Sequence, residues 1–177
     1  MLRRWTRHWN PHRANLRLTF RSAVILTLVV TACGSSSTPR TGIVDRVIDG
    51  DTVDIAFGND LERVRLIGID TPEIGYEGAP DECWAQHAKQ ALQRLLPEGT
   101  EVRVLRDVVA RDHYGRLLGY IFVNNDRFVN GELALNGHAA VLSIAPNESF
   151  SGEIQRAATT ARNSNIGLWR ACDSSAR

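Results

Sequence analysis

Three short strand-like runs joined by tight turns open the folded part of this chain, and they constrain its fold more than any other feature. The runs cover residues 41–48, 51–57 and 61–69. Asp49-Gly50, between the first two runs, is a dipeptide typical of β-hairpin turns. In the third run Val64 and Leu66 alternate with two arginines, which is the period of a strand with one buried face. The N-terminal half is therefore predicted to be β.

The rest of the chain contains both helical and strand-like patterns. Apolar residues recur at helical spacing over residues 83–96, and Pro97 ends this predicted helix. Two strand-like runs, a short helical pattern and a longer one follow, at residues 100–107, 116–123, 132–136 and 151–163. Five short strands with a helix after the third predict a mainly β, α+β domain: a five-stranded OB-fold barrel with about three helices. Such barrels commonly bind oligonucleotides, but a fold alone does not determine function.

The first 32 residues have the composition of a signal peptide. Arginines without any acidic residue precede an almost wholly apolar stretch at residues 23–30, which is shorter than the ~20 residues that span a bilayer. The residues before Cys33 resemble the lipobox of bacterial lipoproteins, which implies cleavage after Ala32 and a lipid on Cys33. A plain secretory signal with an incidental cysteine is the alternative. We expect an exported protein, at the cell envelope or the extracellular face.

Residues 33–40 are predicted to be a flexible tether, residues 41–172 one folded domain, and residues 173–177 a tail. Six of the 21 basic residues and none of the 20 acidic residues lie in residues 1–32. The remaining chain therefore carries 15 basic and 20 acidic residues, a net charge of −5. This balance excludes a protein that holds nucleic acid by bulk electrostatics. Any contact with nucleic acid has to depend on a few arginines and a metal.

Cys83 and Cys172 are left as an even pair if Cys33 is lipidated. Disulfides persist in exported proteins, so the pair is interpreted as a stabilising disulfide rather than as a chemical site. Two buried free thiols are the alternative.

Carboxylates and arginines gather in three short segments. These segments read VIDGDTV at residues 47–53, RLIGIDTPE at residues 65–73 and DHYGR at residues 112–116. Hydrolysis of a phosphodiester around a divalent cation needs both kinds of group: carboxylates for the cation and guanidinium groups for the charge on the phosphate. In this order, and in a chain of this size, the segments resemble the three signature segments of the staphylococcal-type thermonuclease family. The resemblance covers essentially all of residues 41–170.

The resemblance implies a calcium site. Asp51 and Asp70 match direct ligands, the carbonyl of Thr71 matches the third, and Asp49 matches a nearby acid that does not bind the ion directly. Oxygen ligands suit Ca²⁺, and so few carboxylates predict weak binding, of the order of 10⁻⁴–10⁻³ M as in extracellular modules. Taken singly, the segments at Asp49 and at Asp70 could each be no more than a turn.

The resemblance also implies the catalytic residues. Glu73 matches the base candidate that contacts the attacking water, and Arg65 and Arg116 match the arginines that bind the phosphate oxygens. One geometric difficulty remains, because Arg65 and Asp70 are five residues apart and an ideal strand would direct them to opposite faces. A bulge at Gly68 would re-aim the end of the strand.

Two departures from the family concern substrate binding. His113 stands where the family commonly has lysine, and Tyr114 follows it; the matching residues contact the terminal phosphate region of a bound nucleotide. For Tyr114, packing in the core is the alternative. Residues 140–146 read AVLSIAP, where the best-known members carry two tyrosines near a base-stacking pocket. Stacking on an aromatic ring contributes about 1–3 kcal/mol per base, so we expect weaker binding or an altered base preference.

These features predict a calcium-dependent nuclease that hydrolyses DNA and RNA outside the cytoplasm, with single strands favoured. In the implied reaction, water attacks phosphorus in line and the 5′-oxygen departs. We expect a monomer, held at the membrane by a lipid on Cys33. The alternatives are a non-catalytic OB-fold module that binds nucleic acid or protein at the cell envelope, and a structural envelope lipoprotein. A binding module would be expected to have lost part of the acid–arginine set, and a structural lipoprotein leaves that set unexplained.

Overall fold

A computed structural model describes residues 38–124 and 126–172. The predicted signal peptide, the lipidation site at Cys33, most of the predicted tether and the tail at 173–177 lie outside the described residues. None of the described helices is long and apolar enough to cross a membrane.

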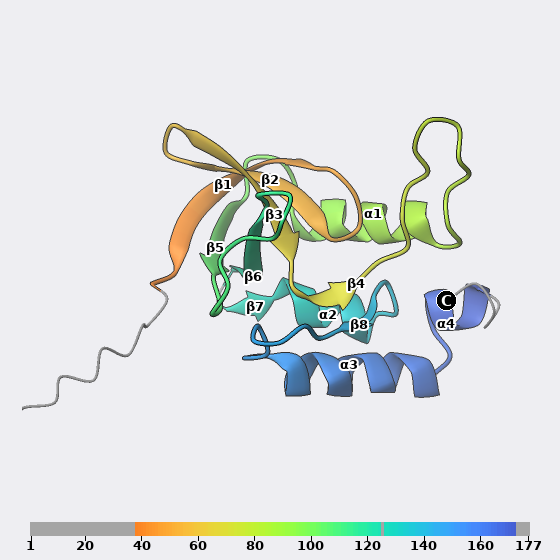
Figure 1. The fold of residues 1–177 in the computed structure, drawn as a ribbon. Helices are drawn as coiled ribbons and strands as arrows, with labels where there is room; N and C mark the ends of the chain where they lie inside the picture. Colours follow the sequence, from red (N-terminus) through yellow and green to blue (C-terminus); the bar gives the residue numbers. More distant parts are fainter. Residues whose placement is uncertain (1–37, 125, 173–177) are drawn as a thin grey trace, which may run out of the picture. The chain divides into compact units, whose positions relative to one another are not determined.

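Five strands close into a barrel (Figure 1). They are β1 (Arg40–Val47), β2 (Thr52–Phe57), β3 (Asp60–Leu66), β5 (Glu101–Leu105) and β6 (Leu117–Val123). Neighbours pair antiparallel in the order β3-β2-β1-β5-β6, and a parallel pairing of β3 with β6 completes the ring. The short strand β7 (Arg127–Phe128) extends the sheet beyond β6. The predicted α+β fold with a five-stranded OB barrel is confirmed.

In the part of the chain that the structure describes, four helices accompany the barrel: α1 (Ala85–Leu95), α2 (Val129–Leu135), α3 (Ser151–Asn163) and α4 (Leu168–Ala171). Figure 1 shows α2 between the barrel and α3, with α1 beside β1 and β2. Leu92 of α1, Leu133 of α2 and Ile154 of α3 are fully buried and belong to one hydrophobic core with the strands. Burial of these apolar faces, rather than capping, holds the helices in place, since none of the four has a side-chain hydrogen bond at its N-cap.

The third strand is broken at Gly68, so the prediction of one strand over residues 61–69 was wrong at its end. Gly68 has a φ of +84°, which L side chains rarely adopt, and its backbone turns the chain into β4 (Gly68–Asp70). A Cβ at this position would lie 2.4 Å from Cδ1 of Ile154, so the close packing of α3 also requires glycine. β4 pairs with β8 (Ala140–Leu142), a strand that the sequence pattern did not indicate.

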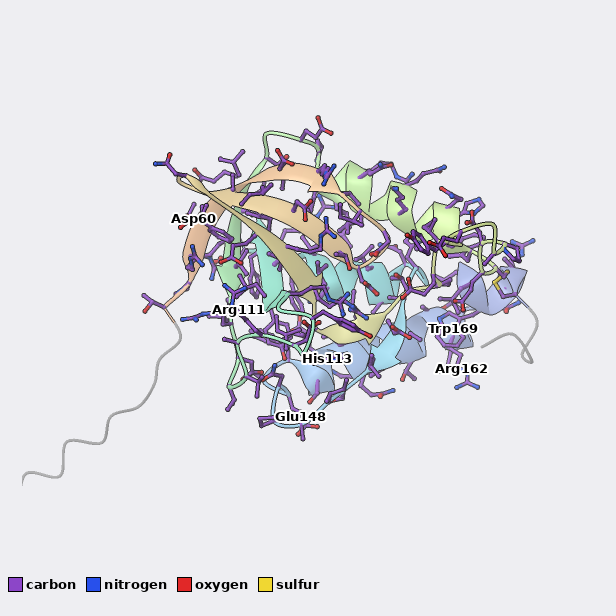
Figure 2. All side chains as sticks on the ribbon, turned by 45° about the horizontal axis from the view of Figure 1, so that its top comes forward. Asp60, Arg111, His113, Glu148, Arg162 and Trp169 are labelled. Carbon is purple, nitrogen blue, oxygen red and sulfur yellow. A yellow bond between two sulfur atoms is a disulfide. The ribbon has the colours of Figure 1, made fainter. Side chains whose placement is uncertain are left out.

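A disulfide joins Cys83, just before α1, to Cys172, just after α4 (Figure 2). The two Cα atoms are 5.8 Å apart and the sequence separation is 89 residues. The interpretation of these cysteines as an even pair agrees with the structure. The bond ties the loop between β4 and α1 to the C-terminal end of the described chain.

Candidate active site

Strand pairing brings Arg65 to Asp51. β2 and β3 pair so that Thr52 lies opposite Arg65, and Asp51 directly precedes β2. The Arg65 Nε atom is 3.0 Å from Oδ1 of Asp51. After the turn at Gly68, the Asp70 carboxylate returns to the same guanidinium, where Arg65 Nη2 donates to Oδ1 at 3.0 Å. The turn therefore removes the difficulty that a straight strand posed, and one guanidinium contacts both acids.

Asp51 is held firmly in the interior of the site. Asp51 is 2% exposed, and its Oδ2 accepts hydrogen bonds from the backbone N–H and the hydroxyl of Thr71, each at 3.0 Å. Burial raises the pKa of the Asp51 carboxyl, Arg65 opposes this, and Asp49 adds to it. Asp49 lies close because its Oδ1 accepts the backbone N–H of Asp51 at 3.0 Å.

Glu73 lies on the loop that follows Thr71. Two hydrogen bonds join the start of this loop to Glu82. The backbone N–H of Glu82 donates to the Glu73 carbonyl at 3.0 Å, and the Glu73 N–H donates to Oε2 of Glu82 at 2.9 Å. Partial burial raises the pKa of the Glu73 carboxyl, with further contributions from Asp49 and Asp70 and an opposing one from Arg65. These contributions place Glu73 within electrostatic reach of the acid–arginine group.

Arg116 is positioned by Asp112 in the loop before β6. Arg116 Nε donates to Oδ2 of Asp112 at 2.7 Å, while Oδ1 accepts the backbone N–H groups of Tyr114 and Arg116 at 3.0 and 2.9 Å. Tyr114 is 74% exposed, so it does not pack in the core. Its ring centroid lies 5.5 Å from the Arg116 guanidinium carbon and 3.7 Å from the His113 ring.

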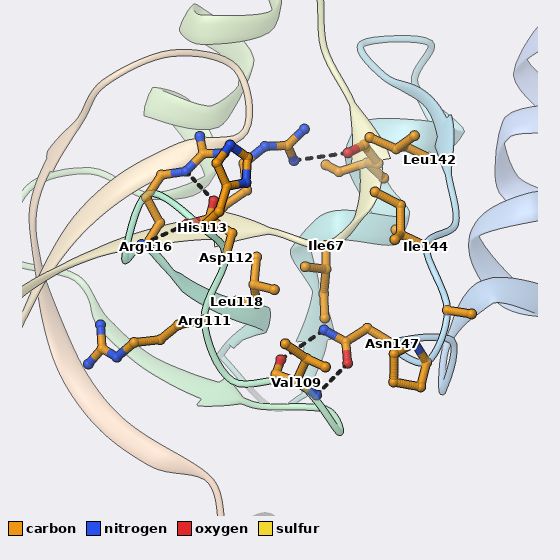
Figure 3. A pocket seen from close by; sticks show the side chains of 15 residues that line it. Ile67, Val109, Arg111, Asp112, His113, Arg116, Leu118, Leu142, Ile144 and Asn147 are labelled. Carbon is orange, nitrogen blue, oxygen red and sulfur yellow. Dashed lines mark hydrogen bonds and ion pairs between the residues drawn. The ribbon is translucent and has the colours of Figure 1, made fainter.

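Arg65 and Arg116 line one hollow of about 340 Å³ (Figure 3). His113 and Asp112 lie on the same side as Arg116, and Leu142 and Ile144 form part of an aliphatic wall across from them (Figure 3). The lining does not include Asp51, Asp70, Glu73 or Tyr114. Asp51 and Asp70 instead contact Arg65, which does line the hollow. The absence of aromatic residues from this wall follows from the AVLSIAP segment.

Asn147 is a site residue that the sequence reasoning missed. It is 6% exposed and lines the hollow, and its side-chain amide accepts from the Val109 N–H and donates to the Val109 carbonyl, each at 2.8 Å (Figure 3). A parallel tie joins Asp107 to Ser149 through the Ser149 N–H and hydroxyl, each at 3.0 Å. The loop carrying Arg116 is thereby fixed to the loop after β8. In the sequence, Asn147 follows Pro146 in a loop, and this pattern does not indicate a contact with a distant segment.

The donors around Arg65 fit a hard cation bound through oxygen. Asp51 and Asp70 share one guanidinium, and Thr71 is tied to Asp51 by two hydrogen bonds. Asp49, Asp51 and Asp70 are grouped around the single guanidinium of Arg65, so a further positive charge here would offset an excess of carboxylates. Within the described ranges, no three or more acidic, histidine or cysteine side chains are grouped to hold a metal. A cation would therefore take most of its ligands from carbonyl and water oxygens, as Ca²⁺ can.

Comparison with known proteins identifies the family. The family model described as "Staphylococcal nuclease homologue" matches residues 63–171, more than half of the chain. The chain belongs to the staphylococcal nuclease family. Membership makes the protein a nuclease, a hydrolase of phosphodiester bonds.

Three relatives show how far the similarity extends. The chain is 35% identical over 127 residues to a thermonuclease of Staphylococcus intermedius, covering 72% of this chain and 74% of the relative. A thermonuclease of Staphylococcus hyicus is 31% identical over 135 residues, covering 76% and 79%. Endonuclease YhcR of Bacillus subtilis (strain 168) is 34% identical over 142 residues, which is 75% of this chain but only 12% of that much longer protein.

Proposed function

We propose that this protein is a calcium-dependent nuclease that hydrolyses DNA and RNA outside the cytoplasm. The observation that carries the proposal is the position of Arg65, whose guanidinium contacts Asp51 and Asp70 and lines the same hollow as Arg116. Two guanidinium groups that face one space beside paired carboxylates suit the charge changes of phosphodiester hydrolysis. A module that only binds nucleic acid has no need of this complete set.

Arg116 would bind the non-bridging oxygens of the scissile phosphate, and Arg65 would add a single contact. Arg65 Nη1 already donates to the carbonyls of Leu66 and Ile69 and its Nη2 to Asp70, so one terminal N–H of Arg65 remains. Among the described residues, the Arg116 guanidinium donates to protein through Nε alone, so its terminal N–H groups remain for a phosphate. A guanidinium can bind two phosphate oxygens side by side, which a lysine cannot do. The contacts would strengthen as negative charge builds on these oxygens in the transition state, and this difference accelerates the reaction.

Glu73 would orient the attacking water. Glu73 is exposed, and two hydrogen bonds between its backbone and Glu82 fix the loop that carries it, so its carboxylate is accessible to water. The bond from water oxygen to phosphorus forms opposite the bond to the 5′-oxygen, which breaks. The 5′-oxygen leaves with a proton, the water loses one, and by family resemblance the other product ends in a 3′-phosphate.

Asp51, Asp70 and the Thr71 carbonyl would hold Ca²⁺, with Asp49 next to Asp51. When bound, the ion would supply positive charge beside the phosphate. The support is chemical: the donors are oxygens, and two carboxylates with water suit a weakly held Ca²⁺ of the kind that extracellular modules bind.

The aliphatic hollow beside Arg116 would take a base next to the scissile phosphate. A base can enter a hollow of this kind only when it is unpaired, so single-stranded DNA and RNA would be the preferred substrates. Contact with Leu142 and Ile144 is not specific for a base and lacks the stacking that aromatic rings provide. Ground-state binding is expected to be weak, while the catalytic groups are complete.

Action outside the cytoplasm is supported by two features. The N-terminal residues have the composition of a signal peptide with a lipobox-like end at Cys33, and the Cys83–Cys172 disulfide suits an oxidising compartment. The protein would act as a monomer tethered at the cell envelope, with a secreted form as the alternative.

The test is digestion of single-stranded DNA by the purified protein with Ca²⁺ and with EDTA, alongside Glu73→Ser and Arg116→Ala. Arg127→Ala is the matched control, because Arg127 forms an exposed ion pair with Glu132 and does not line the hollow. We expect cleavage that needs Ca²⁺, and a loss of about 10²–10³-fold in kcat in Arg116→Ala. A wild-type protein that binds oligonucleotide without cleaving it, at any Ca²⁺ concentration, would instead indicate a binding module.

A further inference from the structure

A second hollow adjoins the proposed active site and takes no part in the mechanism above. Its volume is about 470 Å³, and its lining residues are Arg46, Asp54, Leu61, Arg63, Tyr114, Gly115 and Arg116. Arg116 lines this hollow and the first one, so the two spaces meet at the arginine that would hold the scissile phosphate. A strand leaving the active site on this side would pass directly into the second hollow.

Strand register builds the floor of this hollow. Asp54 of β2 lies opposite Arg46 of β1 and opposite Arg63 of β3, so the three residues form one row across the barrel. An irregularity in β1 between Val44 and Arg46 shifts the register that sets this pairing. The row has the charge order positive, negative, positive.

Asp54 fixes both arginines. It is 3% exposed; its Oδ2 lies 3.0 Å from Nε of Arg46, and its Oδ1 accepts from Nε of Arg63 at 2.8 Å. Arg63 Nη2 also donates to Oδ2 of Asp54, at 3.1 Å. The two arginine side chains remain 58% and 46% exposed, so their outer N–H groups face solvent while their stems are positioned.

Arginines outnumber carboxylates among the residues that line the hollow. The lining holds Arg46, Arg63 and Arg116 against Asp54, while Asp112 pairs with Arg116 and Asp49 acts on Arg63 from outside the lining. The surrounding chain beyond residue 32 has a net charge of −5. If the row only stabilised the barrel, one arginine would be enough to pair with the buried carboxylate. Here two arginines share the Asp54 carboxylate, and both reach solvent.

We propose that Arg46 and Arg63, held by Asp54, form a second phosphate subsite that binds the backbone of a single-stranded nucleic acid beyond the scissile phosphate. The subsite deepens the proposed function and rests on it, because its ligand is the remainder of the same substrate. Exposed Tyr114 lines this hollow with its ring beside Arg116, and it offers a face to a sugar or base. The fixed guanidinium groups suit phosphate oxygens geometrically and lose little freedom on binding.

The experiment measures cleavage by the full protein as a function of substrate length. The variants are Arg46→Gln, Arg63→Gln and the double variant, in which glutamine can still donate a hydrogen bond to Asp54. Arg127→Gln is the control, since Arg127 lines neither hollow. The substrates are a dinucleotide with one phosphodiester bond and single-stranded oligonucleotides of increasing length, each at several salt concentrations.

We expect KM for the long substrates to rise about three- to tenfold per arginine removed, with kcat and the dinucleotide reaction unchanged. The dependence of log KM on log salt should also become shallower, by about 0.7 for each phosphate of a single strand that the variant no longer binds. Unchanged length dependence and salt slope in the double variant would show that the row is a structural ion network only, and would overturn the proposal while leaving the nuclease intact.

Failures of the two proposals can be told apart. If the wild-type protein cleaves nothing, the proposed function fails, and anisotropy of a labelled oligonucleotide then tests the subsite alone: equal Kd for wild type and double variant overturns it. If Arg63→Gln also loses dinucleotide cleavage, its fold is damaged, and Arg46→Gln decides, because Arg46 is the more exposed arginine and makes one hydrogen bond to Asp54.

Discussion

Removal of the Cys83–Cys172 disulfide should destabilise the domain by several kcal/mol. The bond closes a loop with a sequence separation of 89 residues. Chain-entropy theory gives a loss of about 15.5 cal/mol/K from the unfolded chain for a loop of this length, which corresponds to about 4.6 kcal/mol at 25 °C. This value is an upper estimate, because residual structure in the unfolded chain reduces the effect.

The same estimate converts into a melting temperature. Unfolding of a domain of about 130 residues carries an entropy of roughly 0.27 kcal/mol/K, so the melting temperature of the variant should fall by at most ~17 °C. Activity at 25 °C should change much less. The hydrogen bonds between Glu73 and Glu82 close the loop on the active-site side of Cys83, and they do not involve the disulfide.

The assay is urea unfolding followed by tryptophan fluorescence, since Trp84 and Trp169 lie within three residues of the two cysteines. Wild type, wild type with reductant, and the Cys83→Ala/Cys172→Ala double variant are compared, and reductant on the double variant is the control. Reduced wild type and the double variant should have the same, lower midpoint. If the double variant unfolds at the wild-type urea concentration, the entropic reasoning is refuted.

Three further predictions concern stability. Gly68→Ala should lower the free energy of unfolding in urea by about 2–4 kcal/mol, because alanine would be strained at a φ of +84° and would collide with Ile154. Gly58→Ala is the control: Gly58 has a φ of +67° but open space around it, so the loss should be only about 1 kcal/mol. Asp54 has its pKa lowered by hydrogen bonds from Arg63 first and then Arg46, although burial opposes this. Its contribution to stability is therefore complete above the unfolded pKa of about 3.9 and is lost as the pH falls through the lower folded value. Urea midpoints measured from pH 6 to pH 2 should fall for wild type in that window, and the part of the fall due to this residue should be missing in Asp54→Asn. Asn147→Ala should cost about 2 kcal/mol, since it leaves the backbone groups of Val109 without their partner; an unchanged urea midpoint would show that water replaces the amide without loss.

Much of the fold could be predicted because the local signals agree with the final packing. The alternation at Val64 and Leu66 places both side chains in the core, and the helix predicted over residues 151–163 is found at those residues. The helix predicted over 83–96 begins two residues late, since Trp84 adopts a φ of +79°. The short helix predicted at 132–136 starts earlier, at Val129, because Val129 itself is buried against the barrel.

The rest depends on contacts between distant segments, which single-sequence patterns do not encode. β8 pairs with β4 across about 70 residues, and three residues of mixed exposure carry no strand period. The tie between Asn147 and Val109 is of the same kind. The row of Arg46, Asp54 and Arg63 was equally hidden, since both arginines look like ordinary outward residues until the register places one carboxylate between them.

The arrangement of charges explains how a domain with an excess of acids could act on a polyanion. Each arginine that lines one of the two hollows is held by an acid: Arg65 by Asp51 and Asp70, Arg116 by Asp112, Arg111 by Glu62, and Arg46 and Arg63 by Asp54. The acids remove the long-range field that would gather nucleic acid from a distance. In return they fix each guanidinium before the substrate arrives, so that less side-chain entropy is lost when a phosphate binds. Selectivity for the reacting phosphate then comes from contact geometry, which is compatible with an excess of acidic residues in the chain.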